Sequence, residues 1–148
     1  MSDMTLFTPE HRTFLDTQRV GHLATADAAG QPHVVPVCYV AVEDVLYIAL
    51  DAKPKRVAWQ HLKRVRNLLA NPQVALVIDR YSNAWQQLAY LLIRGTAVLL
   101  PPDTAEQQRA VALLRVRYPQ YQAMPIDAQP VVAIRPQAIV AWGTLLEE

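Results

Sequence analysis

Basic side chains between residues 52 and 78 give the strongest chemical signal in this sequence. That window contains no Asp or Glu and six cationic residues, which are Lys53, Lys55, Arg56, Lys63, Arg64 and Arg66. The whole 148-residue chain has 14 basic and 13 acidic residues, for a net charge of +1, so the rest of the chain is net negative. Positive charge gathered in one segment indicates that this segment binds a negatively charged group.

The spacing of apolar residues predicts that most of this window is a helix over residues 54–70. The apolar positions recur at intervals of four, three and four residues, at Ala58, Leu62, Val65 and Leu69. Such spacing places them on one face of a helix. Pro54 suits the first turn, and Asn71-Pro72 ends the helix.

The other face of this expected helix carries the polar groups. Lys63, Arg66 and Asn67 lie three and four residues apart, so they share that face, with Arg64 beside them. Lys55 and Arg56 fall in the first turn, where free backbone N–H groups favour an anion. The pattern fits a phosphate site or an ordinary solvated face, and the absence of acids slightly favours the phosphate site.

Two further groups of residues could contact a flat ligand. Small residues and prolines in the segments Leu23-Ala24-Thr25 and Val35-Pro36-Val37 would allow a ring to approach the backbone. Aromatic residues that could stack on a ring are Tyr39, Trp59, Tyr81, Trp85 and Trp142. A plain β-hairpin is the more common explanation of the first group, and aromatic residues more often fill a core.

The sequence offers no catalytic set of its own. The four histidines, His11, His22, His33 and His61, have no metal-ligand spacing, and Cys38 is the single cysteine. No Ser–His–Asp arrangement, GxGxxG motif or P-loop is present. If the protein is an enzyme, its chemistry therefore belongs to a bound cofactor.

Length and composition favour one globular domain spanning residues 1–148. Hydrophobic residues make up 52% and charged residues 18% of the chain, which is typical of a folded, apolar-rich protein. The first ten residues lack a basic region followed by an apolar run, and no stretch approaches 18 apolar residues. We therefore expect a cytoplasmic protein that does not contact a membrane.

The elements that must position these groups are mostly strands. Turn signals at Asp27–Gly30 and Glu43-Asp44 separate strands over residues 20–26, 33–42 and 45–50. Further strands are expected over residues 74–78, 88–100, 131–134 and 138–142, with a bend or bulge at Gly95. Helices are expected over residues 8–19, capped by Thr8, and from Asp103 to Tyr118, with Asp103 and Glu106 as a capping box. This order favours an antiparallel barrel with attached helices.

Five short motifs in order resemble the flavin-binding split-barrel family related to pyridoxamine 5′-phosphate oxidase. They are Arg19–Thr25, Gly30–Val37, Lys63–Leu68, Asn71–Val74 and Arg94–Ala97, and the resemblance covers residues 8 to 143. It implies a mainly β fold, a six-stranded antiparallel split barrel, and a homodimer with cofactor sites at the subunit interface. The segment Asp79–Trp85 resembles a subgroup dependent on coenzyme F420, a deazaflavin.

The resemblance also implies roles for individual residues. Lys63, Arg64, Arg66 and Asn67 would meet the cofactor phosphate, and Lys55 would serve a longer anionic tail. The ring would lie along Ala24, Thr25, Val35, Pro36 and Val37, near Tyr39. The border of the pocket would come from Tyr81, Trp85 and Trp142, contributed by the partner subunit.

The resulting hypothesis is an oxidoreductase that uses F420 or FMN to reduce a small conjugated or carbonyl-bearing molecule. The chain is too short to contain the substrate-binding C-terminal segment of the vitamin-B6 enzyme, so pyridoxamine phosphate is not the expected substrate. A non-catalytic carrier of flavin or haem is the alternative, with His22, His33 or His61 available as an axial ligand. Nucleic-acid binding is not expected, because the rest of the chain is net negative.

Overall fold

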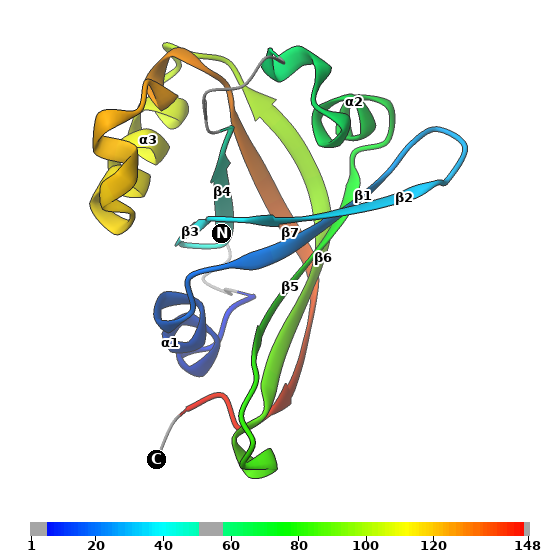
Figure 1. Ribbon diagram of the computed structural model, residues 1–148, viewed down its shortest axis with the longest axis vertical. Helices are drawn as coiled ribbons and strands as arrows, with labels where there is room; N and C mark the ends of the chain where they lie inside the picture. The colour runs from blue at the N-terminus through cyan, green and yellow to red at the C-terminus, as the bar shows by residue number, and fades with distance from the viewer. Residues whose placement is uncertain (1–5, 51–57, 147–148) are drawn as a thin grey trace, which may run out of the picture.

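A curled antiparallel sheet of seven strands forms the body of the protein in the computed structural model, which describes residues 6–50 and 58–146. The order across the sheet is β2-β1-β5-β6-β7-β4-β3, and every neighbouring pair is antiparallel (Figure 1). The strands are β1 (Gly21–Ala26), β2 (Pro32–Val37), β3 (Val40–Val42), β4 (Val45–Ala49), β5 (Gln73–Arg80), β6 (Ala89–Leu100) and β7 (Val131–Gly143).

The two edge strands of this sheet are joined by only two residues. Cys38 and Tyr39 connect β2 to β3, although these strands lie at opposite edges. Such a short connection requires the sheet to curl until its edges meet, as in a barrel. Pro36 lies on the edge strand β2, as its type predicts.

The number of strands differs from the six predicted, because seven are present in the described residues. The predicted strand over residues 33–42 is wrong, since the chain leaves one edge of the sheet at Cys38 and joins the other at Val40. The two strands predicted over residues 131–134 and 138–142 are instead the single long strand β7. The bulge predicted at Gly95 is confirmed by a register shift between Arg94 and Gly95.

The first and last α-helices along the chain begin at hydroxyl caps. The first, α1 (Pro9–Thr17), follows Thr8, whose side chain accepts a hydrogen bond from the His11 N–H at 3.1 Å, as predicted. The helix α3 (Ala105–Arg117) follows Thr104, whose hydroxyl accepts from the Gln107 N–H. The capping box predicted from Asp103 and Glu106 is therefore wrong.

The predicted helix over residues 54–70 is present only in its second half. The helix α2 (Lys63–Ala70) ends at Asn71 as predicted. Before it, Ala58 and Leu62 have extended backbone on either side of a 3-10 turn, η1 (Trp59–His61). Residues 54–57, and with them Lys55, lie outside the described residues.

Two apolar cores hold the helices on the sheet. The interior of the curled sheet packs against α1 and α2, and a second cluster lies between α3 and strands β4 and β7. Three further 3-10 turns, η2 (Trp85–Gln87), η3 (Pro119–Ala123) and η4 (Ile126–Ala128), lie in the connections. Among the described helices, none has the length and apolar character that crossing a membrane requires.

Candidate functional site

The start of α2 combines an open helix end with cations. No side chain caps this end at Leu62, and the first turn contains no acid. The first backbone N–H groups of a helix lack intrahelical acceptors, and the helix dipole adds positive potential there. This end of α2 is therefore suited to an anion.

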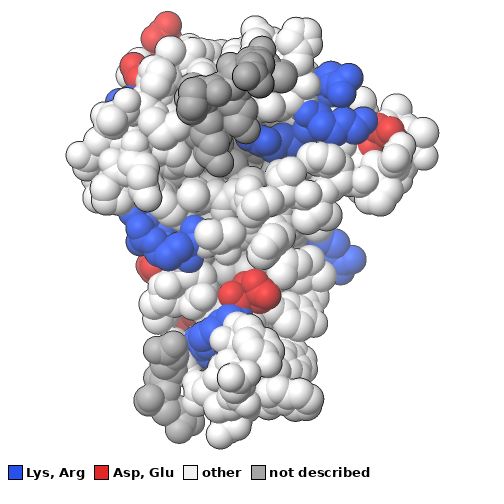
Figure 2. All heavy atoms as spheres, viewed as in Figure 1, with Lys and Arg blue, Asp and Glu red and all other residues white. Residues whose placement is uncertain are grey.

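Three cationic side chains belong to this helix, those of Lys63, Arg64 and Arg66. Figure 2 shows Lys and Arg side chains gathered where Figure 1 places α2. Lys63 lies 3.9 Å from a carboxylate oxygen of Asp27, a long and partly exposed ion pair. In the described part of the chain, neither Arg64 nor Arg66 makes an ion pair. The Arg64 Nε atom is also buried without a hydrogen-bond partner, so the guanidinium has an unsatisfied donor.

Asn67 does not share the exposed face on which Arg66 lies, contrary to the prediction. It is 1% exposed, and its side-chain amide donates a hydrogen bond to the Thr25 hydroxyl at 3.0 Å. The buried face of the helix consists of Val65, Asn67 and Leu68, and Leu69 points to solvent. The Asn67–Thr25 hydrogen bond thus fixes α2 against strand β1.

Asp27 closes the turn between β1 and β2 beside Lys63. Its carboxylate accepts hydrogen bonds from the N–H groups of Ala29 and Gln31, each at 2.9 Å. The Gln31 N–H holds the pKa of Asp27 below its usual range, against the opposing effect of desolvation, and the Ala29 N–H and Lys63 lower it further. Asp27 is therefore a bound turn residue that remains charged, and it only partly neutralises Lys63.

The predicted ring-binding residues on β1 and β2 lie on two different faces of the hairpin. Cross-strand pairing places Ala24 opposite Val34 and His22 opposite Pro36 on the outer face. Thr25, Val35 and Val37 alternate with these residues and point inward, toward α2 and the core. Of this predicted group, only Ala24 and Pro36 therefore face the outside of the sheet.

Tyr39 lies in the core and offers no surface to a ligand. It is 0% exposed, and its hydroxyl donates to the Leu15 carbonyl oxygen at 2.6 Å. Its backbone N–H donates to the Tyr118 hydroxyl at 3.1 Å. Burial raises the pKa of Tyr39 well above the ordinary tyrosine value. The residue is therefore neutral, and its hydrogen bonds connect the joined edges of the sheet to α1.

The three predicted border residues, Tyr81, Trp85 and Trp142, are exposed at the end of the sheet away from α2. Tyr81 and Trp85 are each 73% exposed, and Trp142 stacks on Tyr90 with ring centroids 5.8 Å apart. The chain leaving α2 contacts β6 near Ala97, seven residues from Tyr90 along the strand. At about 3.3 Å per residue, the aromatic group lies roughly 23 Å from α2 within one chain.

An uncovered apolar face runs across the outside of the sheet. One cross-strand row consists of Pro36, His22, Val77, Leu92 and Val140. The neighbouring row consists of Val34, Ala24, Ala75, Arg94 and Ala138. We call these ten residues the outer sheet face. No helix is drawn across this side in Figure 1, and Val34 and Val140 remain 60% and 42% exposed.

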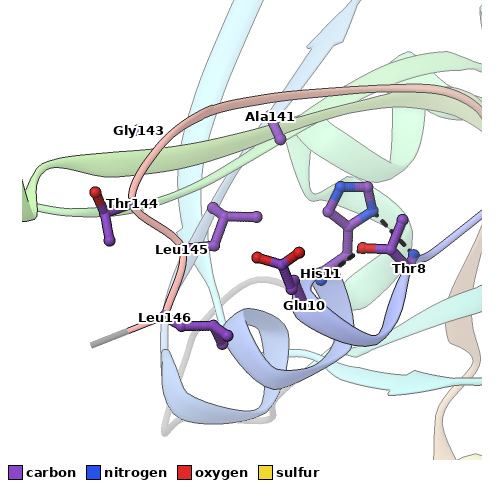
Figure 3. A pocket seen from close by; sticks show the side chains of 8 residues that line it. All are labelled: Thr8, Glu10, His11, Ala141, Gly143, Thr144, Leu145 and Leu146. Atoms are coloured by element: carbon purple, nitrogen blue, oxygen red, sulfur yellow. Dashed lines mark hydrogen bonds between the residues drawn. The ribbon is translucent and has the colours of Figure 1, made fainter. Parts of the chain in front are cut away.

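A groove of about 480 Å³ lies far from α2, between the start of α1 and the chain after β7 (Figure 3). Thr8, Glu10 and His11 line one side of it, and Ala141 and Gly143 to Leu146 line the other. His11 accepts a hydrogen bond from the Thr8 N–H, so it serves the helix cap. Within residues 6–50 and 58–146, no group of three His, Cys, Asp or Glu side chains could hold a metal ion.

One residue beside α2 was considered from the sequence only as a possible haem ligand. His33 is the direct cross-strand partner of Thr25, and its Nδ1 atom is buried without a hydrogen-bond partner. The turn predicted at Asp27–Gly30 would have paired residue 25 with residue 32, and only the observed loop over residues 27–31 places His33 opposite Thr25.

Comparison with known proteins places this arrangement in a family. The family described as pyridoxamine 5′-phosphate oxidase matches residues 7–143. A 5a,11a-dehydrotetracycline/5a,11a-dehydrooxytetracycline reductase from Streptomyces rimosus is 29% identical over 138 residues, which are 93% of this chain and 83% of the reductase.

Solved structures share the fold at lower identity. The haem storage protein HutZ from Vibrio cholerae superposes with a TM-score of 0.73 at 19% identity, over 93% of this chain and 94% of HutZ. An F420 reductase superposes with a TM-score of 0.65 at 24% identity, over 87% of this chain and 94% of the reductase. Because the family match spans nearly the whole chain, this protein belongs to the pyridoxamine 5′-phosphate oxidase family of split-barrel, oxidoreductase-like proteins.

Proposed function

We propose that this protein is an oxidoreductase that binds the phosphate of FMN or coenzyme F420 at the start of α2. The buried, unpartnered Nε of Arg64, next to an uncapped helix end, is the observation that carries the proposal. A phosphate oxygen would satisfy this donor and also face the first N–H groups of the helix. Lys63 would add a second positive charge, because Asp27 neutralises it only partly.

The reduced cofactor, when bound, supplies the hydride for a small conjugated or carbonyl-bearing substrate. The protein contributes position. The Asn67–Thr25 hydrogen bond holds the cationic helix at a fixed place on the β1–β2 hairpin. Ala24 and Pro36 on the outer side of that hairpin leave room for a flat ring to lie against the strands. Catalysis would then come from holding ring and substrate face to face.

We also propose that a second copy of the chain covers the outer sheet face. The apolar character of this face supports an isologous dimer. Tyr81, Trp85 and Trp142 lie far from α2 in their own chain, so they would border the cofactor site only through such a dimer. The test is the molar mass in solution, and a monomer at micromolar concentration would contradict this part of the proposal.

The similarity to a Streptomyces rimosus reductase supports a reductase that acts on a conjugated ring system. We favour F420 over FMN. Lys53, Lys55 and Arg56 are additional cations for its longer anionic tail, although they lie outside the described residues. The single cysteine, Cys38, suits a protein of the reducing cytoplasm.

The test is cofactor titration of the wild type and two charge variants. We expect Lys63→Ala and Arg64→Ala each to weaken FMN or F420 binding by about ten- to a hundredfold, since a charge-assisted hydrogen bond is worth roughly 1.5–3 kcal/mol. Arg109→Ala, on the exposed side of α3, removes the same charge and should leave the affinity unchanged.

Three results would count against the proposal. Equal cofactor affinities in the wild type and the three variants would mean that the phosphate does not bind at α2. Failure to bind either cofactor would reject the oxidoreductase assignment. A Soret band on haem addition, lost when His22, His33 or His61 is replaced, would instead support the carrier alternative.

A further inference from the structure

We propose that His33 is a proton-dependent binding residue of the α2 anion site, an inference that rests on the proposed function. The imidazole Nδ1 is buried and makes no hydrogen bond in the described part of the chain. A buried nitrogen without a partner is uncommon in a folded protein, because losing its water costs free energy. A neutral imidazole with an empty nitrogen can gain a proton and become a second donor.

The hairpin register places this imidazole beside the anion site. His33 pairs directly with Thr25, and side chains of such pairs lie about 5 Å apart at Cβ. The Thr25 hydroxyl in turn accepts from Asn67, one helical turn after Lys63. His33 therefore lies on the side of the hairpin against which α2 packs.

The charges around His33 make its proton depend on the ligand. The groups on the packed elements are Lys63 and Arg64 of α2, the more exposed Arg66, and Asp27 at the end of β1. Lys63 and Arg64 oppose another positive charge, and Asp27 is already committed to its turn N–H groups and Lys63. An arriving phosphate reverses this balance and favours the protonated imidazole. Binding of the anion then takes up a proton at His33.

This coupling predicts that FMN binds more tightly at lower pH. One linked proton changes a dissociation constant by at most tenfold per pH unit. Between pH 8 and pH 6 we therefore expect the affinity of the wild type for FMN to rise by about tenfold more than that of His33→Asn. The FMN phosphate titrates in the same range in both proteins, so only the difference between them reports on His33. His11→Gln is the matched control, because Gln at this position preserves the helix cap far from α2.

A second measurement does not depend on any variant. Calorimetric titration of the wild type with FMN at pH 7, in buffers of different ionisation enthalpy, counts the protons taken up on binding. We expect a fraction of one proton above the amount that free FMN phosphate accounts for. His33→Asn should abolish this excess, and His11→Gln should retain it.

The outcomes separate this inference from the proposed function. Tight FMN binding with no excess proton uptake, or with the same pH profile in His33→Asn, overturns the role of His33 and leaves the α2 site intact. Loss of the excess in His11→Gln would assign the proton elsewhere and overturn it too. Absence of FMN and F420 binding at every pH overturns both proposals.

Discussion

The buried hydrogen bond between Asn67 and Thr25 is the contact whose removal should reveal most about this protein. Asn67 is 1% exposed and Thr25 is 4% exposed, and their side chains meet at 3.0 Å. In Asn67→Ala the Thr25 hydroxyl loses its donor, and an unsatisfied buried group costs about 1–3 kcal/mol. The small cavity adds to this cost. We expect destabilisation by about 2–3 kcal/mol, which lowers the Tm by roughly 5–10 °C at this chain length.

A double-mutant cycle isolates the hydrogen bond from the other effects. Thr25→Val keeps the shape of the side chain but leaves the Asn67 amide unpaired, so it should cost about 1–2 kcal/mol. The double variant should be less destabilised than the sum of the single variants by about 0.5–1.5 kcal/mol. Urea unfolding followed by tryptophan fluorescence measures each free energy, since the chain has three Trp residues.

Additive effects, within about 0.3 kcal/mol, would refute the reasoning. They would mean that the two side chains do not stabilise each other and that α2 is held by Val65 and Leu68 alone. If the reasoning holds, Asn67→Ala should also weaken FMN or F420 binding while it is still folded. The reason is that its loss frees Lys63 and Arg64 from their fixed position over the hairpin.

Two further predictions concern stability. In Gly143→Ala the added Cβ would lie 2.0 Å from the Leu88 carbonyl oxygen at a φ of +87°, so we expect a loss of more than 3 kcal/mol in the free energy of unfolding. Gly30→Ala has a φ of +86° and open space, and should lose only about 1–2 kcal/mol; equal losses would mean that the close approach at Gly143 is relieved. Hydrogen bonding from Tyr47, against the opposing effect of desolvation, and the contact with Arg135 lower the pKa of Glu106. Its contribution to stability is therefore present above the unfolded value of 4.5 and disappears as the pH falls through the lower folded value. Wild type and Glu106→Gln should thus differ in Tm at pH 7 and converge as the pH falls below the lowered folded pKa, and a constant difference would contradict the assigned shift.

Local chemistry made much of this fold predictable. Thr8 caps α1, the Asp27 turn joins two strands, and Gly95 marks a bulge in β6. Each of these features depends on residues within a few positions of one another, or on the lack of a side chain. The cationic cluster at Lys63 and Arg64 was visible for the same reason, because charges adjacent in sequence stay adjacent on a helix.

Long-range pairing decided the features that the sequence did not reveal. The largely apolar run over positions 33–42 fits one strand or two, and only the closing of the sheet separates them at Cys38 and Tyr39. Adjacent residues of a strand always face opposite sides, but only the tertiary structure shows that Thr25 faces inward and Ala24 outward.

Residue types alone therefore predicted an antiparallel barrel with positive charge concentrated in one segment. Composition and turn chemistry act locally, and no tertiary contact is needed to detect them. The tertiary structure decided where α2 begins, why Asn67 is buried, and that His33 lies opposite Thr25 with a buried, unpartnered Nδ1. These features depend on packing between segments about forty residues apart. The apolar spacing of the sequence predicted that Asn67 faces solvent, but its hydrogen bond to Thr25 allows it to be buried.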